Sequence, residues 1–212
     1  IDMHLEALRQ MGARFLIHDG QLDCSAPEGL HGAVIHLPFP SVGATENVML
    51  AAVLAKGRTV LHNAAKEPEI CDLAAFLRSC GADISGDGAG TMVISGVKQL
   101  RGCSYSIMPD RIAGITYLGA AAITGGTVCL RGTDASPMDN MLPVLEQMGC
   151  RIYPEPDRLH LLAPRRLRPA FAPLLPWQLP ALPLPKPYRP RAPAALRRDG
   201  NGPQRPPSPP TS

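Results

Sequence analysis

Ser41, Val42 and Gly43 form the start of an expected helix, and their residue types suit an anion-binding site. Ser41 is a favoured N-cap residue, and Gly43 has no side chain to hold a ligand away from the backbone. The free amides of a helix N-terminus, together with the helix dipole, favour a phosphate or another anion. Because most capped helices bind nothing, the three residues are compatible with either an anion site or an ordinary helix start.

Asp110 and Arg111 form a second helix start, at which an acidic N-cap residue is followed by a cation. Taken alone, this pair is typical of a capped helix whose arginine is solvated. A glycine-rich run over residues 86–90, GDGAG, resembles a nucleotide loop. It lies between two expected strands, so a hairpin turn is the better interpretation.

The elements that must position these residues are copies of one another. The three copied segments read LRQMGARF from Leu8, LRSCGADI from Leu77 and LEQMGCRI from Leu145. Their glycines lie 69 and then 68 positions apart. Self-similarity at a fixed period is typical of an architecture that repeats one structural unit, so we expect a unit of about 70 residues.

Each unit is expected to be mixed α/β, with the order βαβαββ. In the middle copy we predict, in turn, a helix over 45–56 ended by Gly57, a strand over 59–62, a helix over 68–80 ended by Gly81, two strands around 86–90 and a third strand over 103–107. The first copy lacks its opening half. The third copy begins at Asp110 and should end near Leu174, which gives about two and a half units in the chain.

The cysteines and histidines do not have the spacing of a metal site. The six cysteines contain no CxxC pair, and the six histidines are scattered. Cys80 occupies the position that Met11 and Met148 hold in the other copies. We therefore expect core thiols in a reducing compartment, without a disulfide framework or a bound metal.

The net charge of +3 hides two regions of opposite sign. From Pro164 onward there are nine Lys or Arg against one acid, whereas the preceding residues hold 12 basic and 17 acidic side chains. This balance gives no indication of nucleic-acid binding, and no apolar run approaches the roughly 20 residues of a membrane span. No signal-peptide pattern follows Ile1, so we expect an internal fragment of a cytoplasmic protein.

The segment from Pro164 to Ser212 contains 15 of the 24 prolines and is expected to be extended and disordered. The stretch KPYRPR leaves open a role as a ligand for modules that bind proline-rich segments. The repeat stops in the middle of a unit, after Leu167 and Arg168, and a composition rich in Pro, Arg, Leu and Ala follows. This abrupt change is better interpreted as a shifted reading frame.

Three motifs in the same order closely resemble UDP-N-acetylglucosamine enolpyruvyl transferase. They are PSVGATEN from Pro40, EPEICDLAAFLRSCGADISGDG from Glu67 and MPDRIAGITYL from Met108. The resemblance implies an inside-out α/β prism, in which each of two domains holds three βαβαββ units around a pseudo-threefold axis. The present chain would be incomplete, with part of the first domain over 1–108, one unit of the second over 109–168 and the aberrant tail over 169–212.

The resemblance also implies an activity. Members of this family transfer the enolpyruvyl group of phosphoenolpyruvate to the 3-hydroxyl of UDP-N-acetylglucosamine and release phosphate, the first committed step of peptidoglycan synthesis. No cofactor, metal, nucleic acid or membrane partner is implied. One alternative is the related transferase of the shikimate pathway, which lacks the EPEICDLAAFL pattern. Another is a non-catalytic protein that binds only a nucleotide sugar, or a partner through its proline-rich segment.

The family's binding residues match defined positions here. The resemblance places Ile1, Asp2 and Met3, with the following His4, beside the uracil and ribose of the nucleotide sugar. It places Ser41, Val42 and Gly43 at the nucleotide and its diphosphate. The residues that it places near the cleft are Glu67, Asp110 and Arg111. Phe39 and Pro40 stand where some members have Lys-Val, which puts a side-chain cation contact there in doubt.

The catalytic groups of the family have no match in this chain. The reactive cysteine and a phosphoenolpyruvate-binding lysine would lie upstream of Ile1. The general base is an aspartate that would fall near Leu184, but no Asp or Glu occurs between Asp157 and Asp199. The reaction must deliver one proton and remove another, so we expect these 212 residues alone to be inactive.

Overall fold

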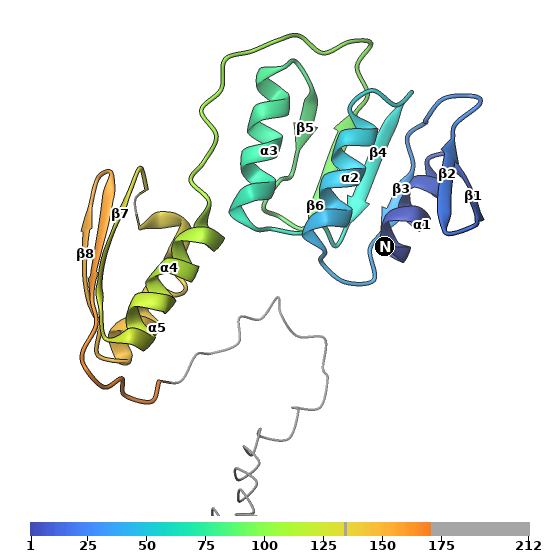
Figure 1. Ribbon diagram of the computed structural model, residues 1–212. Helices are drawn as coiled ribbons and strands as arrows, with labels where there is room; N and C mark the ends of the chain where they lie inside the picture. Colours follow the sequence, from blue (N-terminus) through green and yellow to red (C-terminus); the bar gives the residue numbers. More distant parts are fainter. Residues whose placement is uncertain (134, 171–212) are drawn as a thin grey trace, which may run out of the picture. The chain divides into compact units, whose positions relative to one another are not determined.

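The computed structural model describes residues 1–133 and 135–170 (Figure 1). The helices are α1 (Asp2–Gln10), α2 (Val42–Ala52), α3 (Pro68–Ser79), α4 (Arg111–Thr124), the short 3₁₀ helix η1 (Ser136–Met138) and α5 (Leu142–Gln147). The strands are β1 (Arg14–His18), β2 (Gln21–Ser25), β3 (Val34–His36), β4 (Arg58–His62), β5 (Asp83–Ser85), β6 (Thr91–Ser95), β7 (Thr127–Arg131), β8 (Arg151–Glu155) and β9 (Arg158–Leu162).

One complete βαβαββ unit runs from β3 through α2, β4, α3 and β5 to β6, which confirms the predicted fold class. Its sheet has the order β3-β4-β6-β5, in which β3 and β4 are parallel and the other pairs are antiparallel. The first copy contributes α1 and the β1–β2 hairpin. The third copy contributes α4, β7, α5 and the three-stranded sheet β7-β9-β8.

The three repeated glycines explain why the copied segments are alike. Gly12, Gly81 and Gly149 follow α1, α3 and α5 with φ of 96°, 98° and 98°. This left-handed region is easily reached only by glycine, and it turns the chain out of each helix. Each copied segment is therefore a helix end that leads directly into a strand.

Helix α2 is shifted relative to its predicted range of 45–56. It begins at Val42 and ends at Ala52, so the prediction is wrong at both ends. The Lys56 amide donates to the carbonyl of Leu30 at 2.9 Å, and the Gly32 amide donates to the carbonyl of Lys56 at 2.8 Å. Because Lys56 pairs with the segment that enters β3, it cannot also continue the helix.

The third strand predicted over 103–107 does not form, and the segment over 101–110 has no regular secondary structure. Its counterpart one copy earlier is β3, which pairs with β4. The strand that corresponds to β4, 69 positions later, is β7, and among the described residues it pairs with β9. The other edge of β7 is unpaired among the described residues, yet residues 103–107 do not add to it and instead contact α3 and its C-cap through Cys103 and Tyr105.

The described residues form two hydrophobic cores. The larger is built from residues 7–94 and includes Met49, Leu61 and Ile94, and the smaller is built from residues 118–161. The described residues nevertheless belong to one compact unit, so the predicted division at residue 109 stays a prediction. The expected proline-rich tail lies, from residue 171 onward, outside the described residues, as do Leu174 and the expected end of the third copy.

The cysteines are only partly the core thiols that we expected. All six are free, but Cys24, Cys103 and Cys129 are exposed, whereas Cys80 and Cys150 are buried. Cys24 lies on a two-stranded hairpin that is open to solvent, and Cys103 lies in the segment that failed to form a strand.

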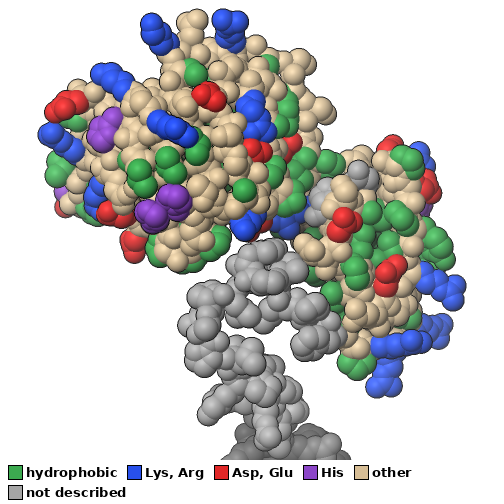
Figure 2. Space-filling model, turned by 180° about the vertical axis from the view of Figure 1, so that it is seen from behind, with side chains coloured by type: hydrophobic (Ala, Val, Ile, Leu, Met, Phe, Trp, Pro, Cys, Tyr) green, Lys and Arg blue, Asp and Glu red, His purple; other side chains and the backbone are tan. Residues whose placement is uncertain are grey.

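On the face seen in Figure 2, acidic and basic side chains are interspersed over the larger body, without a broad basic surface.

Candidate functional site

The start of α2 is an open helix N-terminus. Ser41 is the N-cap, as predicted, with an extended backbone, and its hydroxyl accepts a hydrogen bond from the Ala44 amide at 3.4 Å. The Thr45 amide donates to the Ser41 carbonyl. Within the described residues no hydrogen bond is recorded for the amides of Val42 and Gly43, so the first turn keeps donors for a ligand.

Helix α1 brings a second helix start beside the first. His4 of α1 contacts Asn47 of α2 through its ring nitrogen Nδ1, and a Cβ built on Gly43 would lie 3.2 Å from the His4 ring. The structure therefore brings together the two sets of residues that the resemblance assigned to nucleotide binding. Asp2 lies in the first turn of α1, and its carboxylate suits hydroxyl or N–H donors better than a phosphate.

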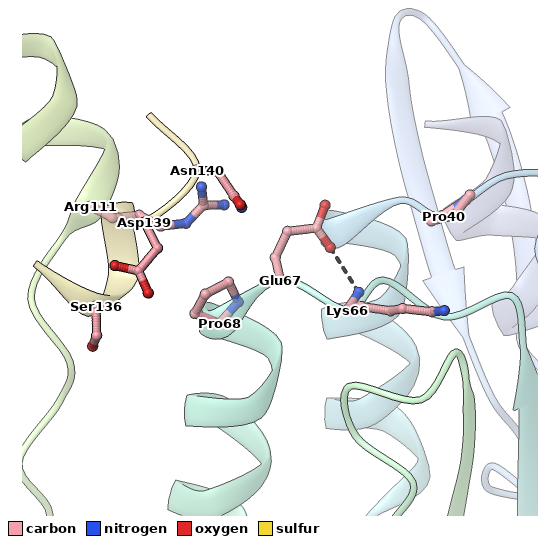
Figure 3. Close-up of a pocket in the computed structure, with 8 residues that line it drawn as sticks. All are labelled: Pro40, Lys66, Glu67, Pro68, Arg111, Ser136, Asp139 and Asn140. Carbon is pink, nitrogen blue, oxygen red and sulfur yellow. Dashed lines mark hydrogen bonds between the residues drawn. The ribbon is translucent and has the colours of Figure 1, made fainter. Parts of the chain in front are cut away.

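A pocket of about 260 Å³ adjoins the start of α2 through Pro40. Figure 3 shows Arg111, Asp139 and Asn140 on one side of it and Lys66, Glu67 and Pro68 on the other. Ser136 completes the lining. The pocket therefore collects two cations, two acids and an amide, a set of side chains that can bind a polar ligand by charge and by hydrogen bonds.

Lys66 and Glu67 reach the pocket because they directly precede α3. Pro68 occupies the first position of that helix, where the missing N–H costs nothing, and the Glu67 side chain does not cap the helix. The Glu67 carboxylate instead accepts a hydrogen bond from the Lys66 amide at 2.8 Å, as drawn in Figure 3. Within the described residues Lys66 forms no recorded ion pair, so its ammonium group can bind an anion.

Arg111 is held in place by Glu69 of α3. Its Nε and one terminal nitrogen donate to the two carboxylate oxygens of Glu69 at 3.0 and 2.8 Å. These hydrogen bonds hold the pKa of the Glu69 carboxyl below its usual range and raise the pKa of Arg111. A guanidinium has five N–H donors, so three are left for a ligand in the pocket.

Asp110 does not line the pocket, although the resemblance placed it near a cleft. Its carboxylate caps α4 and accepts from the amides of Ile112 at 2.9 Å and Ala113 at 3.0 Å. Of the three residues assigned to the cleft, Glu67 and Arg111 contribute side chains to the pocket. Asp110 positions the helix that carries Arg111.

Several residues of the site were missed by sequence reasoning. They are Asn47, Lys66, Pro68, Glu69, Ser136, Asp139 and Asn140. Lys66 had a usable signal, because a cation just before a Pro-started helix lies at a helix N-terminus. The Glu69–Arg111 pair spans 42 positions in sequence, and no spacing rule predicts a contact at that distance.

Two further classes of site find no support in the described part of the chain. It contains no group of three or more His, Cys, Asp or Glu arranged to hold a metal ion. None of its helices is long and apolar enough to cross a membrane.

The fold is that of the enolpyruvyl transferases. The enolpyruvyl transferase NikO from Streptomyces tendae superimposes with a TM-score of 0.70 at 23% identity, covering 79% of this chain and 43% of that one. EPSP synthase from Acinetobacter baumannii gives a TM-score of 0.58 at 20% identity, covering 81% of this chain and 41% of that one. At such identities the likeness establishes the fold alone.

The family follows from the sequence comparison. Residues 1–177 match the family described as EPSP synthase (3-phosphoshikimate 1-carboxyvinyltransferase), and the chain belongs to this family. The curated relatives that it resembles carry the name UDP-N-acetylglucosamine 1-carboxyvinyltransferase. The protein of Gluconobacter oxydans (strain 621H) is 49% identical over 155 residues, which are 73% of this chain and 37% of the relative. That of Symbiobacterium thermophilum is 45% identical over 177 residues, 84% of this chain and 40% of the relative. The chain thus spans about two fifths of their length.

Proposed function

We propose that this chain belongs to a UDP-N-acetylglucosamine 1-carboxyvinyltransferase and supplies part of its substrate site. The enzyme would transfer the enolpyruvyl group of phosphoenolpyruvate to the 3-hydroxyl of the sugar nucleotide and release inorganic phosphate. The observation that carries the proposal is the 45–49% identity to relatives of that name over more than two thirds of this chain. Relatives named for a transfer reaction favour an enzyme over a protein that only binds a nucleotide sugar.

The contribution that we assign to this chain is binding. The open amides at Val42 and Gly43 would donate hydrogen bonds to the diphosphate, while Ile1, Asp2 and Met3 would lie beside the uracil and ribose. The proximity of α1 and α2, through His4 with Gly43 and Asn47, supports one continuous nucleotide site. Two neighbouring helix N-termini stabilise a doubly charged diphosphate more than a single helix N-terminus would.

The pocket next to Pro40 is the proposed place for the charged end of the second substrate. Lys66 forms no ion pair with another described residue, and Arg111 has donors beyond those used by Glu69. Phosphate and carboxylate groups are recognised by cations of this kind. We assign no proton donor and no general base to the residues of this chain.

The assignment to peptidoglycan synthesis, and with it to cell shape and cell division, rests on the same relatives. We also place the protein in the cytoplasm. Six free cysteines support that location, because thiols stay reduced there.

The nucleotide site is tested by titrating the ¹⁵N-labelled 212-residue chain with UDP-N-acetylglucosamine and, separately, with 3-phosphoshikimate. We expect amide shifts from the sugar nucleotide at Met3, His4 and residues 42–47. Gly43→Val should weaken binding, because the new side chain meets His4 and obstructs the first turn. Gly119→Val is the matched control, since a Cβ at Gly119 meets nothing within 4 Å. Shifts that cluster elsewhere, equal binding by Gly43→Val, or a preference for 3-phosphoshikimate would contradict the proposal.

A further inference from the structure

The segment over 101–110, which connects β6 to α4, is attached along one face of α3. The helix residues that carry the attachment are Glu69, Asp72, Phe76 and Cys80, spaced three and four apart and so on one side of the helix. Four contacts run in order from the C-terminal to the N-terminal end of α3. The chain therefore runs antiparallel to α3, and we call residues 101–110 the connector.

The middle of the connector is held by Tyr105. Its hydroxyl donates to the Asp72 carboxylate at 2.9 Å, and its ring contacts Phe76 edge to face at 5.6 Å between centroids. The Met108 amide donates to the other carboxylate oxygen of Asp72 at 3.4 Å. Arg111, just beyond the connector, pairs with Glu69.

The first contact brings two thiols together. The sulfur of Cys80 lies 3.4 Å from the sulfur of Cys103, and the Arg101 amide donates to the Cys80 carbonyl at 2.8 Å. A disulfide needs a separation of about 2.05 Å, so the sulfurs would have to approach by roughly 1.4 Å. Cys80 is fixed as the C-cap of α3, but Cys103 lies in a segment without ladder hydrogen bonds and is free to make that adjustment.

The two thiols differ in exposure, and this sets their order of reaction. Cys103 is exposed, whereas Cys80 is only 8% exposed. The hydrogen bond to Cys103, with burial as a further cause, raises the pKa of the Cys80 thiol. An oxidant from solvent therefore reaches Cys103 first, with Cys80 in position to react second.

We propose that Cys80 and Cys103 form a reversible disulfide, made by a peroxide, that fastens the connector to α3. In the first step the Cys103 thiolate attacks one peroxide oxygen, the O–O bond breaks, and a sulfenic acid and hydroxide result. In the second step the Cys80 sulfur attacks the Cys103 sulfur, the S–O bond breaks, and the departing hydroxide takes the thiol proton as water. In total two thiols are oxidised and one hydrogen peroxide is reduced to two waters.

The bond would restrain the segment that leads to Arg111 and the pocket. It closes a loop of 23 positions that contains β5 and β6, both already ordered in the fold. The connector, in contrast, has no strand pairing and depends on the few contacts to α3 described above. We therefore expect oxidation to slow amide exchange over residues 104–107 and to leave the β5–β6 hairpin unchanged.

The test uses the whole 212-residue chain. Trypsin places its six cysteines in six different peptides, so a linked pair of peptides identifies which two cysteines are joined. The reduced protein is treated with hydrogen peroxide at low protein concentration, blocked with a maleimide and digested without reductant. We expect a peptide of residues 79–98 joined to one of residues 102–111, on a protein that migrates as a monomer, and separation of the two by dithiothreitol. Joining of Cys80 to the peptides 15–56, 67–78, 112–131 or 132–151, a linked dimer, or no linked peptide would overturn the proposal.

Two variants separate proximity from general reactivity. Cys103→Ser should abolish the linked peptide and leave Cys80 as a free thiol, whereas Cys129→Ser, which removes another exposed cysteine, should leave the link intact. Hydrogen exchange of oxidised and reduced protein then tests the consequence. If residues 104–107 exchange at the same rate in both, the disulfide does not restrain the connector and that part of the proposal fails.

Discussion

The starts of α2 and α4 occupy equivalent positions in two copies of the repeat, 69 residues apart, and they are built in opposite ways. At α2 a neutral Ser41 makes one long hydrogen bond and leaves the first amides open. At α4 the Asp110 carboxylate occupies two amides, and the adjacent Arg111 pairs with Glu69. Equivalent backbone positions thus give one helix start, at α2, that can bind an anion from solution. At the other, α4, the Asp110 carboxylate already occupies the free amides.

The second turn of each helix extends this contrast. Thr45 of α2 is fully buried, and its hydroxyl accepts a hydrogen bond from the Ala65 amide at 3.0 Å. The equivalent residue of α4 is Gly114, where a Cβ would lie 3.1 Å from the sulfur of Met138. One copy fixes the following loop by a polar contact, and the other makes room for an apolar side chain.

The largest effect on stability is expected from Thr45→Val. The substitution keeps the shape of the side chain but leaves the buried Ala65 amide without a partner, at a cost of about 1–3 kcal/mol in the free energy of unfolding. Urea denaturation measures this loss. Thr45→Ser is the control, because it keeps the hydroxyl and should lose only the contribution of one methyl group, about 0.8 kcal/mol. Equal stability of Thr45→Val and the unmodified chain would show that the hydrogen bond is unimportant.

Ser41→Asp converts the start of α2 to the kind found at α4. The new carboxylate should accept from the first-turn amides and repel a diphosphate, so we expect the affinity for UDP-N-acetylglucosamine to fall about tenfold, or 1.4 kcal/mol. Calorimetric or NMR titration measures it. Ser41→Asn caps a helix as well but carries no charge, and it should retain more affinity than Ser41→Asp. The reverse order would contradict the open-start interpretation.

Asp110→Ala removes the cap of α4. Two amides lose their acceptor, and we expect a loss of about 1 kcal/mol in the free energy of unfolding. Asp110→Asn should restore most of it, since an amide oxygen also caps. Thermal and urea unfolding of the three proteins would decide the matter, and an unaffected Asp110→Ala would mean that water replaces the carboxylate without cost.

The smallest effect concerns pH. Arg111 depresses the pKa of Glu69 in the folded protein, so the unfolded chain binds a proton at that group more readily. The stabilisation is present above the ordinary pKa of glutamate and is lost as pH falls through the lowered pKa of the folded state. Since both side chains are partly exposed, we expect less than about 1 kcal/mol. Urea unfolding across the acid range should show a shallower decline for Glu69→Gln than for the Glu46→Gln control, and parallel curves would be the contrary result.

Local features of this molecule were predictable from its sequence, and contacts between distant residues were not. The Ser41 cap, the Pro68 helix start and the hairpin around Gly88 depend on residues within a few positions, so residue type alone indicated them. The strand over 103–107 was predicted from the repeat alone, whereas the contacts that this segment makes instead, from Cys103 to Cys80 and from Tyr105 to Asp72, join residues far apart in the sequence.

The residues of the candidate site were likewise predictable from the sequence only in part. Ser41, Val42 and Gly43 were predicted from local chemistry, whereas Ile1, Asp2 and Met3 were found only through a family resemblance. The packing of His4 on Gly43 depends on how α1 lies on α2. The bond between Arg111 and Glu69 depends on a connector whose path no local rule describes.

The pairing of β3 with β4 has a consequence for how such a protein can change by genetic exchange. By sequence β3 belongs to the first copy, since it matches the segment after Leu100, but it is the edge strand of the sheet made by the second copy. A breakpoint at the border between copies would therefore separate a sheet from its own edge. A crossover just before β3 would instead transfer an intact sheet, and insertions or recombined sequences should be tolerated there more readily than between β3 and α2.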